Sequence, residues 1–248
     1  MDPAVLRDDM VEGLEHEAKG VVRSESVSLA MREVPRHDFL DGDRGAYADR
    51  AHERLGTRVL APSTAARLLE ALSVRPDHNV LVVGAGVGYT AAVCASITGE
   101  ANVQAVDITR PVVYAARENL NRAGYGGVLV DRRDGARGLA EYAPFDRILV
   151  EAAAVDPPAA LVDQLTSGGR LVIPLGTGSQ TLSVIDGEGD LVERLGTVAF
   201  DPLLVDGEQA GSIERNRTAR EDREFARRAE RRRHGWEHEW IDWERDRR

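Results

Sequence analysis

The segment NVLVVGAGVGY, residues 79–89, decides the fold of this chain. The apolar run from Val80 to Val83 has no alternating polar residue, which predicts a strand buried on both faces of a parallel sheet. The three glycines that follow allow a tight turn and a close approach of ligand to backbone. The run 90–95 predicts a helix whose N-terminal N–H groups point at the same space. We therefore expect a nucleotide-type site at the carboxyl end of this strand.

The glycine pattern is Gly-x-Gly-x-Gly, at positions 84, 86 and 88. It matches neither the Gly-x-Gly-x-x-Gly of dinucleotide-binding proteins nor a phosphate-binding loop, which ends in Gly-Lys. A turn that simply requires glycine is one alternative. A membrane span is another, because residues 80–99 carry no charge and approach the roughly 20 residues that a bilayer requires. The glycines within this stretch and the negative mean hydropathy of the chain argue against a span.

The length and cysteine content favour a soluble cytoplasmic protein. A chain of 248 residues, 42% of them hydrophobic, can bury the core of one domain and still carry an appendage. Cys94 is the single cysteine, and we expect it to be a buried packing residue of the helix after the glycine turn. The first residues mix charges without an apolar segment, so no signal peptide is expected.

The charge pattern is unusual because the net charge is −10 and Lys19 is the single lysine among 32 basic residues. An acidic surface with almost no lysine is expected of a halophilic protein, since concentrated salt screens the repulsion between its carboxylates. A genome that prefers arginine codons is the alternative explanation.

The alternation of strand-like and helix-like segments predicts the fold class. We expect an α/β protein with a mainly parallel sheet, an antiparallel edge hairpin and N-terminal helices. Before the glycine turn we expect helices at 5–19, 27–33 and 65–72, a loop at 41–55, and Ser63 or Thr64 as N-cap of the third helix. After it we expect strands at 102–107, 127–130, 145–150 and 170–175, helices at 110–123 and 158–165, and a hairpin from 180–185 and 191–200.

The chain changes character near residue 211, so we divide it into a domain at 1–210 and a charged tail at 211–248. Residues 215–248 contain 12 arginines and 9 acidic residues. The three tryptophans, Trp236, Trp240 and Trp243, would share one face of a helix. This face could dock on its own domain or on a second subunit; a nucleic-acid contact through the arginines and a disordered tail are the alternatives.

Three features at the ends of three consecutive predicted strands favour an adenosine-type ligand. The turn at 84–88 provides close backbone contact. Asp107 ends the second strand, where a carboxylate that binds ribose hydroxyls is expected. Asp134 follows the third strand and could accept a hydrogen bond from an adenine amino group. Either aspartate taken alone is more often a turn or cap residue. The prediction of an adenosine-type site rests on the occurrence of all three features together.

Motifs along the chain resemble those of protein-L-isoaspartate O-methyltransferases, which use S-adenosylmethionine to methylate the carboxylate of damaged aspartyl residues in proteins. The matching stretches are AMREVPRHDF (30–39), AYAD (46–49), VGAGVGY (83–89), DG (134–135), APFD (143–146), AAA (152–154), QL (164–165) and GGRLVIPLG (168–176). Their order and spacing hold from about residue 5 to 205. The resemblance implies the Rossmann-like fold of class I S-adenosylmethionine-dependent methyltransferases.

The resemblance also implies site residues and partners. It implies S-adenosylmethionine bound at Gly84, Ala85, Gly86, Gly88, Tyr89, Asp107, Asp134 and Gly135, and no metal. It implies damaged isoaspartyl proteins as substrates over the loops 56–62 and 151–158, with substrate-binding residues Ala61, Pro62, Glu151, Ala152 and Ala153. We expect no membrane partner, and no feature of the sequence selects an oligomeric state.

The chain departs from the family pattern on the substrate side. The family usually has Gly-x-Thr-Ile-Ser-x-Pro where this chain has GTRVLAP at 56–62, so Leu60 replaces the serine and Arg58 the threonine. Thr57, Arg58 and Leu60 are therefore the candidate catalytic positions. Glu151 stands where the family usually has threonine. A substrate carboxylate beside Glu151 would meet like-charge repulsion unless Glu151 is protonated or Arg58 lies between them.

These departures leave three functional hypotheses. The first is repair of isoaspartyl proteins, which survives the loss of the serine because a carboxylate nucleophile is already ionised and needs no general base. The second is methyl transfer to another acceptor, such as RNA reached by the arginine-rich tail. The third is a module that binds S-adenosylmethionine without transferring its methyl group.

Overall fold

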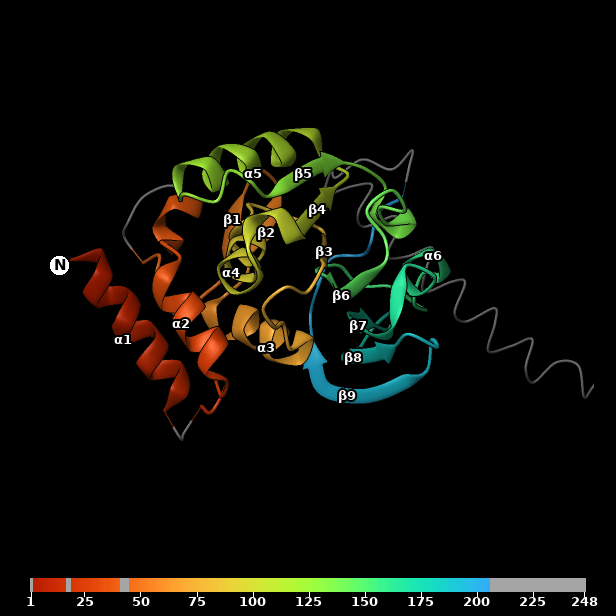
Figure 1. The fold of residues 1–248 in the computed structure, drawn as a ribbon. Coiled ribbons are helices and arrows are strands. Elements are labelled where there is room, and N and C mark those ends of the chain that lie inside the picture. Colours follow the sequence, from red (N-terminus) through yellow and green to blue (C-terminus); the bar gives the residue numbers. More distant parts are fainter. Residues whose placement is uncertain (1, 17–18, 41–44, 206–248) are drawn as a thin grey trace, which may run out of the picture.

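The computed structural model describes residues 2–16, 19–40 and 45–205, and a twisted sheet lies at the centre of these residues (Figure 1). The strand order is β5-β4-β3-β6-β7-β8-β9. The pairs from β5 to β7 are parallel, and β7–β8 and β8–β9 are antiparallel. The expected α/β fold is confirmed. The strands are β3 (Val80–Val83), β4 (Val103–Asp107), β5 (Leu129–Arg132), β6 (Phe145–Val150), β7 (Leu165–Leu175), β8 (Gln180–Asp186) and β9 (Leu191–Val198).

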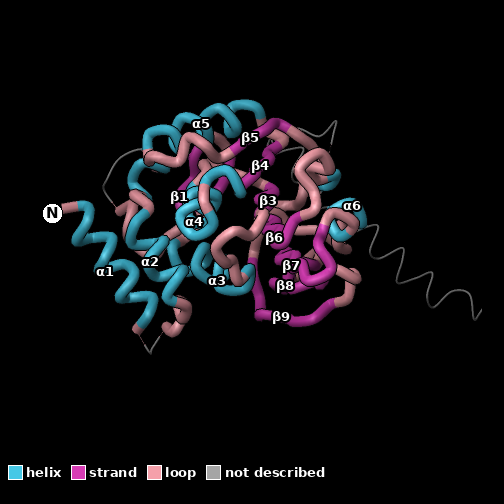
Figure 2. The backbone as a smooth tube through the Cα atoms, viewed as in Figure 1, coloured by secondary structure: helices cyan, strands magenta, loops and turns pink. Residues whose placement is uncertain are grey.

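Helices cover both faces of the sheet (Figure 2). Val80 and Val82 of β3 pack into one hydrophobic cluster, while Leu81 and Val83 pack into a second cluster with residues of α6. The continuous burial predicted for this strand is confirmed, because both of its faces are covered. The helices are α1 (Pro3–Glu15), α2 (Glu25–Glu33), α3 (Pro62–Leu72), α4 (Tyr89–Thr98), α5 (Arg110–Arg122) and α6 (Ala159–Val162), with short 3-10 turns η1 (Arg36–Phe39), η2 (Glu100–Asn102) and η3 (Gly135–Arg137).

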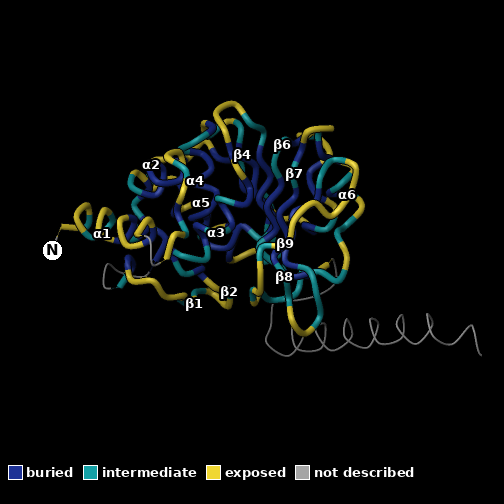
Figure 3. Tube along the Cα trace, turned by 90° about the horizontal axis from the view of Figure 1, so that it is seen from below, coloured by how far each residue is buried: buried dark blue, intermediate teal, exposed yellow. Residues whose placement is uncertain are grey.

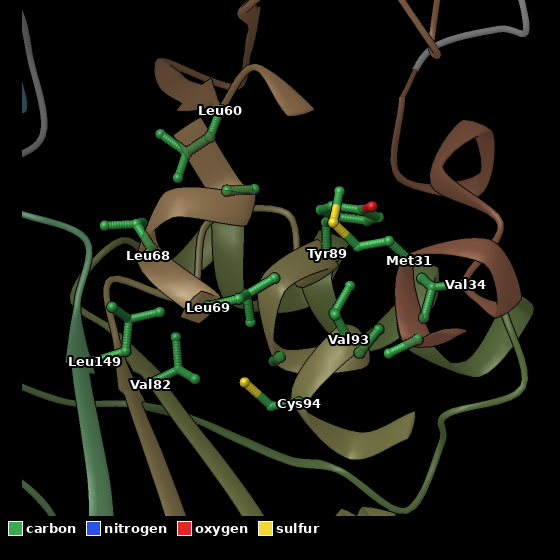
Figure 4. Close-up of a cluster of buried hydrophobic side chains, with 14 of the residues drawn as sticks. Met31, Val34, Leu60, Leu68, Leu69, Val82, Tyr89, Val93, Cys94 and Leu149 are labelled. Atoms are coloured by element: carbon green, nitrogen blue, oxygen red, sulfur yellow. The ribbon is translucent and has the colours of Figure 1, made fainter. Parts of the chain in front are cut away.

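The larger cluster joins the N-terminal helices to the sheet. Helix α1 packs on α2, and α2 packs on α4. Figure 4 shows side chains of this cluster from α2, α3, α4 and the sheet, with Cys94 among them. Cys94 is a free, fully buried thiol, so the packing role expected for it is confirmed. Figure 3 shows the central strands buried and the N-terminal helix α1 mostly exposed.

The start of α3 differs from the prediction. The N-cap is Ala61, and Pro62 occupies the first turn, where its missing N–H costs nothing. The prediction of Ser63 or Thr64 as N-cap was therefore wrong. Asp49, fourteen residues before Ser63, supplies the capping oxygen instead, because its Oδ1 accepts from the Ser63 N–H at 2.9 Å.

The expected loop at 41–55 contains a strand that the sequence did not predict. Strand β1 (His52–Arg54) pairs antiparallel with β2 (Thr57–Val59) in a separate hairpin. Leu55 and Gly56 form its turn with φ of 53° and 73°. A positive φ is rare for leucine, so the sequence carried no ordinary signal for this turn.

Two further boundaries were predicted wrongly in the second half of the chain. The helix expected at 158–165 is limited to the four residues of α6. Gly168 and Gly169 lie inside β7 and not before it. The register between β6 and β7 shifts there, from Phe145 opposite Leu165 to Arg147 opposite Arg170, and this irregularity accommodates the glycines.

Within the described ranges, the structure contains no helix of the length and apolarity that a membrane crossing requires. Residues 80–99 form β3, the glycine turn and α4. The predicted domain boundary at 211 and the arginine- and tryptophan-rich tail lie outside the described residues.

Candidate active site

A cavity opens at the carboxyl ends of β3, β4 and β6. The space between its walls is about 840 Å³, open solvent at its mouth included. Parallel strands bring their carboxyl ends to one edge of the sheet, so residues distant in sequence meet there. The lining residues are Leu55, Gly56, Thr57, Arg58, Leu60, Val83, Gly84, Gly86, Val106, Asp107, Ile108, Thr109, Val112, Gly135, Glu151, Ala152, Phe200, Asp201, Pro202, Leu203 and Leu204.

The glycine turn forms the floor of this cavity. Gly84, Gly86 and Gly88 have φ of 82°, 52° and 94°, which side chains other than hydrogen disfavour. A Cβ built on Gly86 would have no neighbour closer than 3.9 Å, so its backbone faces open space. A Cβ on Gly88 would lie 3.1 Å from Leu120 Cγ. Gly88 is the N-cap of α4 and does not line this cavity.

Asp107 connects the turn to the neighbouring strand. It is the last residue of β4, and its Oδ2 accepts from the Gly86 N–H at 3.2 Å. Its Oδ1 accepts from the N–H of Thr109, the N-cap of α5, at 2.8 Å. The structure therefore brings Asp107 and the glycine turn to one cavity wall, in the arrangement expected for a carboxylate that binds ribose hydroxyls.

Gly135 reaches the cavity, whereas Asp134 has a capping role next to it. Asp134 is 7% exposed, and its Oδ1 accepts from the Ala136 N–H at 3.0 Å as N-cap of η3. A Cβ on Gly135 would overlap the side chain of Val83, so the close packing of η3 on β3 requires glycine. A contact between Asp134 and an adenine stays a prediction.

A smaller cavity of about 250 Å³ adjoins the first and shares part of its wall. Two residues predicted for the cofactor, Ala85 and Tyr89, line this smaller cavity and not the larger one. The Tyr89 ring is buried against Arg36, whose Cζ lies 4.7 Å from the ring centroid, and burial raises the pKa of its hydroxyl. The residues common to both cavities are Arg58, Leu60, Gly86 and Glu151.

Glu151 follows β6 and lies against the glycine turn. Its N–H donates to the Val83 carbonyl at 2.8 Å, and a Cβ built on Gly84 would lie 3.6 Å from the Glu151 Cβ. Among the described residues, the buried atom Oε1 has no hydrogen-bond partner. Burial raises the pKa of the Glu151 carboxyl to about 7, against a hydrogen bond from Thr90 that lowers it, and the charge of Asp107 raises it further.

The three candidate catalytic residues come from the hairpin β1–β2 and the residue that follows it. Thr57 Oγ1 would lie 4.0 Å from a Cβ on Gly86, so it faces the turn across the cavity. The Arg58 guanidinium is turned to the rim, where Nη1 donates to the Ala199 carbonyl at 3.2 Å. The structure thus places Arg58 beside the cavity without an ion pair to Glu151.

Leu60 belongs both to the cavity wall and to the core. Its side chain is 8% exposed and packs in the larger hydrophobic cluster, above α3 in Figure 4. Its carbonyl accepts from Nη2 of the buried Arg36, and Arg36 Nε donates to the Ala46 carbonyl at 2.8 Å. The main chain at the family's serine position is therefore held whatever side chain it carries.

The remaining predicted substrate residues divide into two groups. Ala152 lines the larger cavity, but Ala61 and Pro62 line neither cavity because they begin α3. Ala153 forms a β-bridge to Pro202, with its N–H donating to the Asp201 carbonyl at 2.8 Å.

That bridge brings residues 200–204 over the site, and sequence reasoning missed this wall. The Leu203 N–H donates to the Ala153 carbonyl at 2.8 Å, which fixes the segment to the loop after β6. A proline followed by two leucines matches no known binding motif, so no signal in the sequence indicated that residues 200–204 would line the site. Within the described part of the chain, no group of three or more His, Cys, Asp or Glu side chains is placed to hold a metal ion.

Comparisons with known proteins agree with this geometry. Residues 7–208 match the family model described as protein-L-isoaspartate(D-aspartate) O-methyltransferase. A protein-L-isoaspartate O-methyltransferase of Methanosarcina mazei is 39% identical over 206 residues, which cover 80% of this chain and 83% of that protein. One of Aeropyrum pernix is 43% identical over 207 residues, covering 79% and 78%.

Two solved structures share the fold. A protein-L-isoaspartate O-methyltransferase superposes with a TM-score of 0.71 at 27% identity, covering 86% of this chain and 69% of that one. A Plasmodium falciparum structure, described as a putative protein-L-isoaspartate O-methyltransferase in complex with S-adenosyl-L-homocysteine, also gives 0.71. It is 24% identical and covers 80% of this chain and 98% of its own.

Proposed function

Because the chain belongs to the protein-L-isoaspartate(D-aspartate) O-methyltransferase family, we propose that it methylates isoaspartyl carboxylates of damaged proteins with S-adenosylmethionine as methyl donor. One observation carries the proposal. A single cavity is lined by the glycine turn and Asp107 and also by Thr57, Leu60 and Glu151. A donor and an acceptor could therefore meet within one enclosed space.

The donor side of the cavity fits S-adenosylmethionine. Asp107 offers a carboxylate for ribose hydroxyls, Gly84 and Gly86 offer backbone without a Cβ, and Gly135 bounds the space from η3. When bound, this cofactor supplies a sulfonium methyl group, whose C–S bond breaks as a carboxylate oxygen forms the new C–O bond and the thioether leaves.

The acceptor side has mainly to align the reactants and exclude water. A carboxylate with an ordinary pKa near 4 is ionised at neutral pH, so no residue has to remove a proton. Alignment and desolvation of two reactants can lower a barrier by about 7–11 kcal/mol. Leu60 presents an apolar surface and Thr57 a hydroxyl, so the wall retains both properties without the family's serine.

A labelling experiment tests the proposal. The protein is incubated in concentrated salt with radiolabelled S-adenosylmethionine and either an isoaspartyl peptide or its aspartyl twin. Base-labile label on the isoaspartyl peptide alone supports repair. Label on neither peptide, with cofactor binding retained, contradicts it and favours a binding module. Label on RNA supports the alternative acceptor, whose only motivation is the tail beyond the described residues.

We also propose a salt-rich cytoplasm as the working environment. The support is the net charge of −10 with a single lysine, together with a lone cysteine that is buried and reduced. The midpoint of thermal unfolding should rise between low and molar KCl. Equal midpoints in both would leave arginine codon preference as the explanation.

A further inference from the structure

The wall shared by the two cavities (the partition) contains all three departures from the family pattern, Arg58, Leu60 and Glu151. Leu60 and Glu151 line the larger and the smaller cavity alike, so each side chain faces the space where an acceptor would approach the glycine turn. Leu60 cannot form a hydrogen bond with its side chain. Polar side-chain contacts from the wall shared by the two cavities can therefore come from Glu151 or from Arg58, and the Arg58 guanidinium already donates to the Ala199 carbonyl.

The carboxyl group of Glu151 has a buried oxygen available to a ligand. The Thr90 hydroxyl interacts with this group and lowers its pKa, against the larger effect of burial. Among the described residues Oε1 is buried and has no hydrogen-bond partner. A buried polar atom without a partner is already desolvated, so a ligand that satisfies it gains that hydrogen bond at little further cost in desolvation.

We propose that Glu151 binds the acceptor as a neutral carboxylic acid, with the Oε1 hydroxyl donating a hydrogen bond to one oxygen of the isoaspartyl carboxylate. This inference rests on the proposed function and names the residue that replaces the hydroxyl missing at position 60. Two carboxyl groups that share one proton attract each other, whereas two carboxylates repel. The second acceptor oxygen stays free to take the methyl group, and Glu151 keeps its proton when the neutral ester leaves.

The charges around Glu151 favour the neutral acid. Asp107 at the end of β4 acts on it with a like charge, and Asp201 adds a second carboxylate to the same cavity. The buried Cys94 thiol of α4 carries no charge, because burial and the nearby Glu151 raise its pKa well above the ordinary thiol value. Of the positive groups, Arg58 lines the cavity but donates to the Ala199 carbonyl.

Tyr89 lines the smaller cavity together with Glu151. Burial raises the pKa of the Tyr89 hydroxyl, so it too is neutral near pH 7. Arg36 lies behind this ring and directs Nε and Nη2 to backbone carbonyls. Glu151 and Tyr89 are thus both neutral near pH 7, while Asp107 and Asp201 are the carboxylates of the larger cavity.

Proton-linked binding tests the inference without turnover. An isoaspartyl peptide is titrated calorimetrically into the full chain saturated with S-adenosylhomocysteine, at pH 6 and pH 8, in buffers of different ionisation enthalpy. We expect proton uptake at pH 8 and little at pH 6, with affinity falling about tenfold per pH unit above 7. Methylation at subsaturating peptide should fall in parallel.

Two variants separate this role from a structural one. Glu151→Gln keeps a hydrogen-bond donor without a titrating proton, so peptide binding should persist at pH 8 with no proton uptake and no dependence on pH. Glu118→Gln, on the exposed face of α5, is the matched control and should keep the wild-type proton uptake. A Glu151→Gln variant with undiminished proton uptake would overturn the inference.

The outcomes also distinguish this inference from the proposed function. If the wild-type protein methylates the isoaspartyl peptide but binds it equally at pH 6 and pH 8 with no proton uptake, the function stands and the role of Glu151 is wrong. If the peptide is neither bound nor methylated at any pH while S-adenosylhomocysteine binds, both fail together.

Discussion

The site has a donor half around the glycine turn and an acceptor half around the hairpin β1–β2, and the two differ in their use of main chain and side chains. The donor half consists of main chain: glycines with positive φ, N–H groups held by Asp107, and a 3-10 turn packed on β3. The acceptor half consists of side chains that project from the hairpin β1–β2 and from the loop after β6. A site made of main chain tolerates few sequences, whereas a site made of side chains can change while the fold persists. In this chain the departures from the family pattern fall in the acceptor half.

The largest expected effect is that of Leu60→Ser, which restores the family's serine. Leu60 is 8% exposed and packs in the core, so we expect a loss of roughly 2–4 kcal/mol in the free energy of unfolding, the scale of other leucine truncations. Denaturant unfolding measures it, with Leu191→Ser on the exposed part of β9 as control. Equal stability of Leu60→Ser and wild type would mean that the acceptor half is independent of the core.

Glu151→Gln should change stability in a way that depends on pH. The folded state holds the Glu151 proton up to about pH 7, while a model carboxyl loses it at 4.5, so the stability of the wild type falls as the pH rises between these values. The variant escapes this loss. We expect it to gain about 1–3 kcal/mol over wild type at pH 8, discounted for the open cavity, and nothing at pH 4.

Denaturant unfolding of both proteins at the two pH values measures this gain. A constant difference between wild type and Glu151→Gln across the range would show that the Glu151 pKa is the same in the folded and unfolded states, and the acceptor half would then be anionic at pH 8. Glu118→Gln again serves as the exposed control.

Asp107→Ala should weaken the donor half. The change removes a carboxylate that lines the cavity and accepts from the Gly86 N–H, so we expect affinity for S-adenosylhomocysteine to fall by about tenfold or more, the scale of one charge-assisted hydrogen bond. Calorimetry measures it, with Asp9→Ala on the exposed side of α1 as control. Unchanged affinity would remove Asp107 from the site.

The smallest expected effects separate two glycines within the turn. Gly86→Ala places a methyl group in the cavity and strains one left-handed residue by about 1 kcal/mol, so cofactor affinity should fall several-fold. Gly88→Ala meets Leu120 and should lower stability by about 1–2 kcal/mol without a direct effect on affinity. Thermal unfolding and calorimetry on both variants measure the difference. The reverse pattern would place the cofactor over Gly88.

The sequence predicted the donor half well because its signals are local. The valines of β3, the glycines after them and Asp107 at the end of β4 lie in short stretches whose pattern fixes their conformation. The hairpin β1–β2 escaped prediction because Leu55 adopts a φ that leucine rarely takes.

The other features that the sequence did not predict depend on contacts between distant segments. Residues 200–204 reach the site through hydrogen bonds to Ala153, which lies about fifty positions earlier. The cap of α3 comes from Asp49 and not from an adjacent serine or threonine. Contacts of this kind depend on the assembled fold, and the acceptor half is made largely of them.

The hydrogen bond from Arg36 to the Leu60 carbonyl affects which substitutions position 60 can tolerate during evolution. Because the bond is to the main chain, it holds the hairpin beside the glycine turn whichever side chain stands at position 60. A substitution at position 60 can therefore change the contacts with the acceptor while Arg36 still holds the main chain of the hairpin. The buried arginine thus makes the acceptor position a place where new substrates can be explored at low risk to folding, provided that the incoming side chain fills the same space.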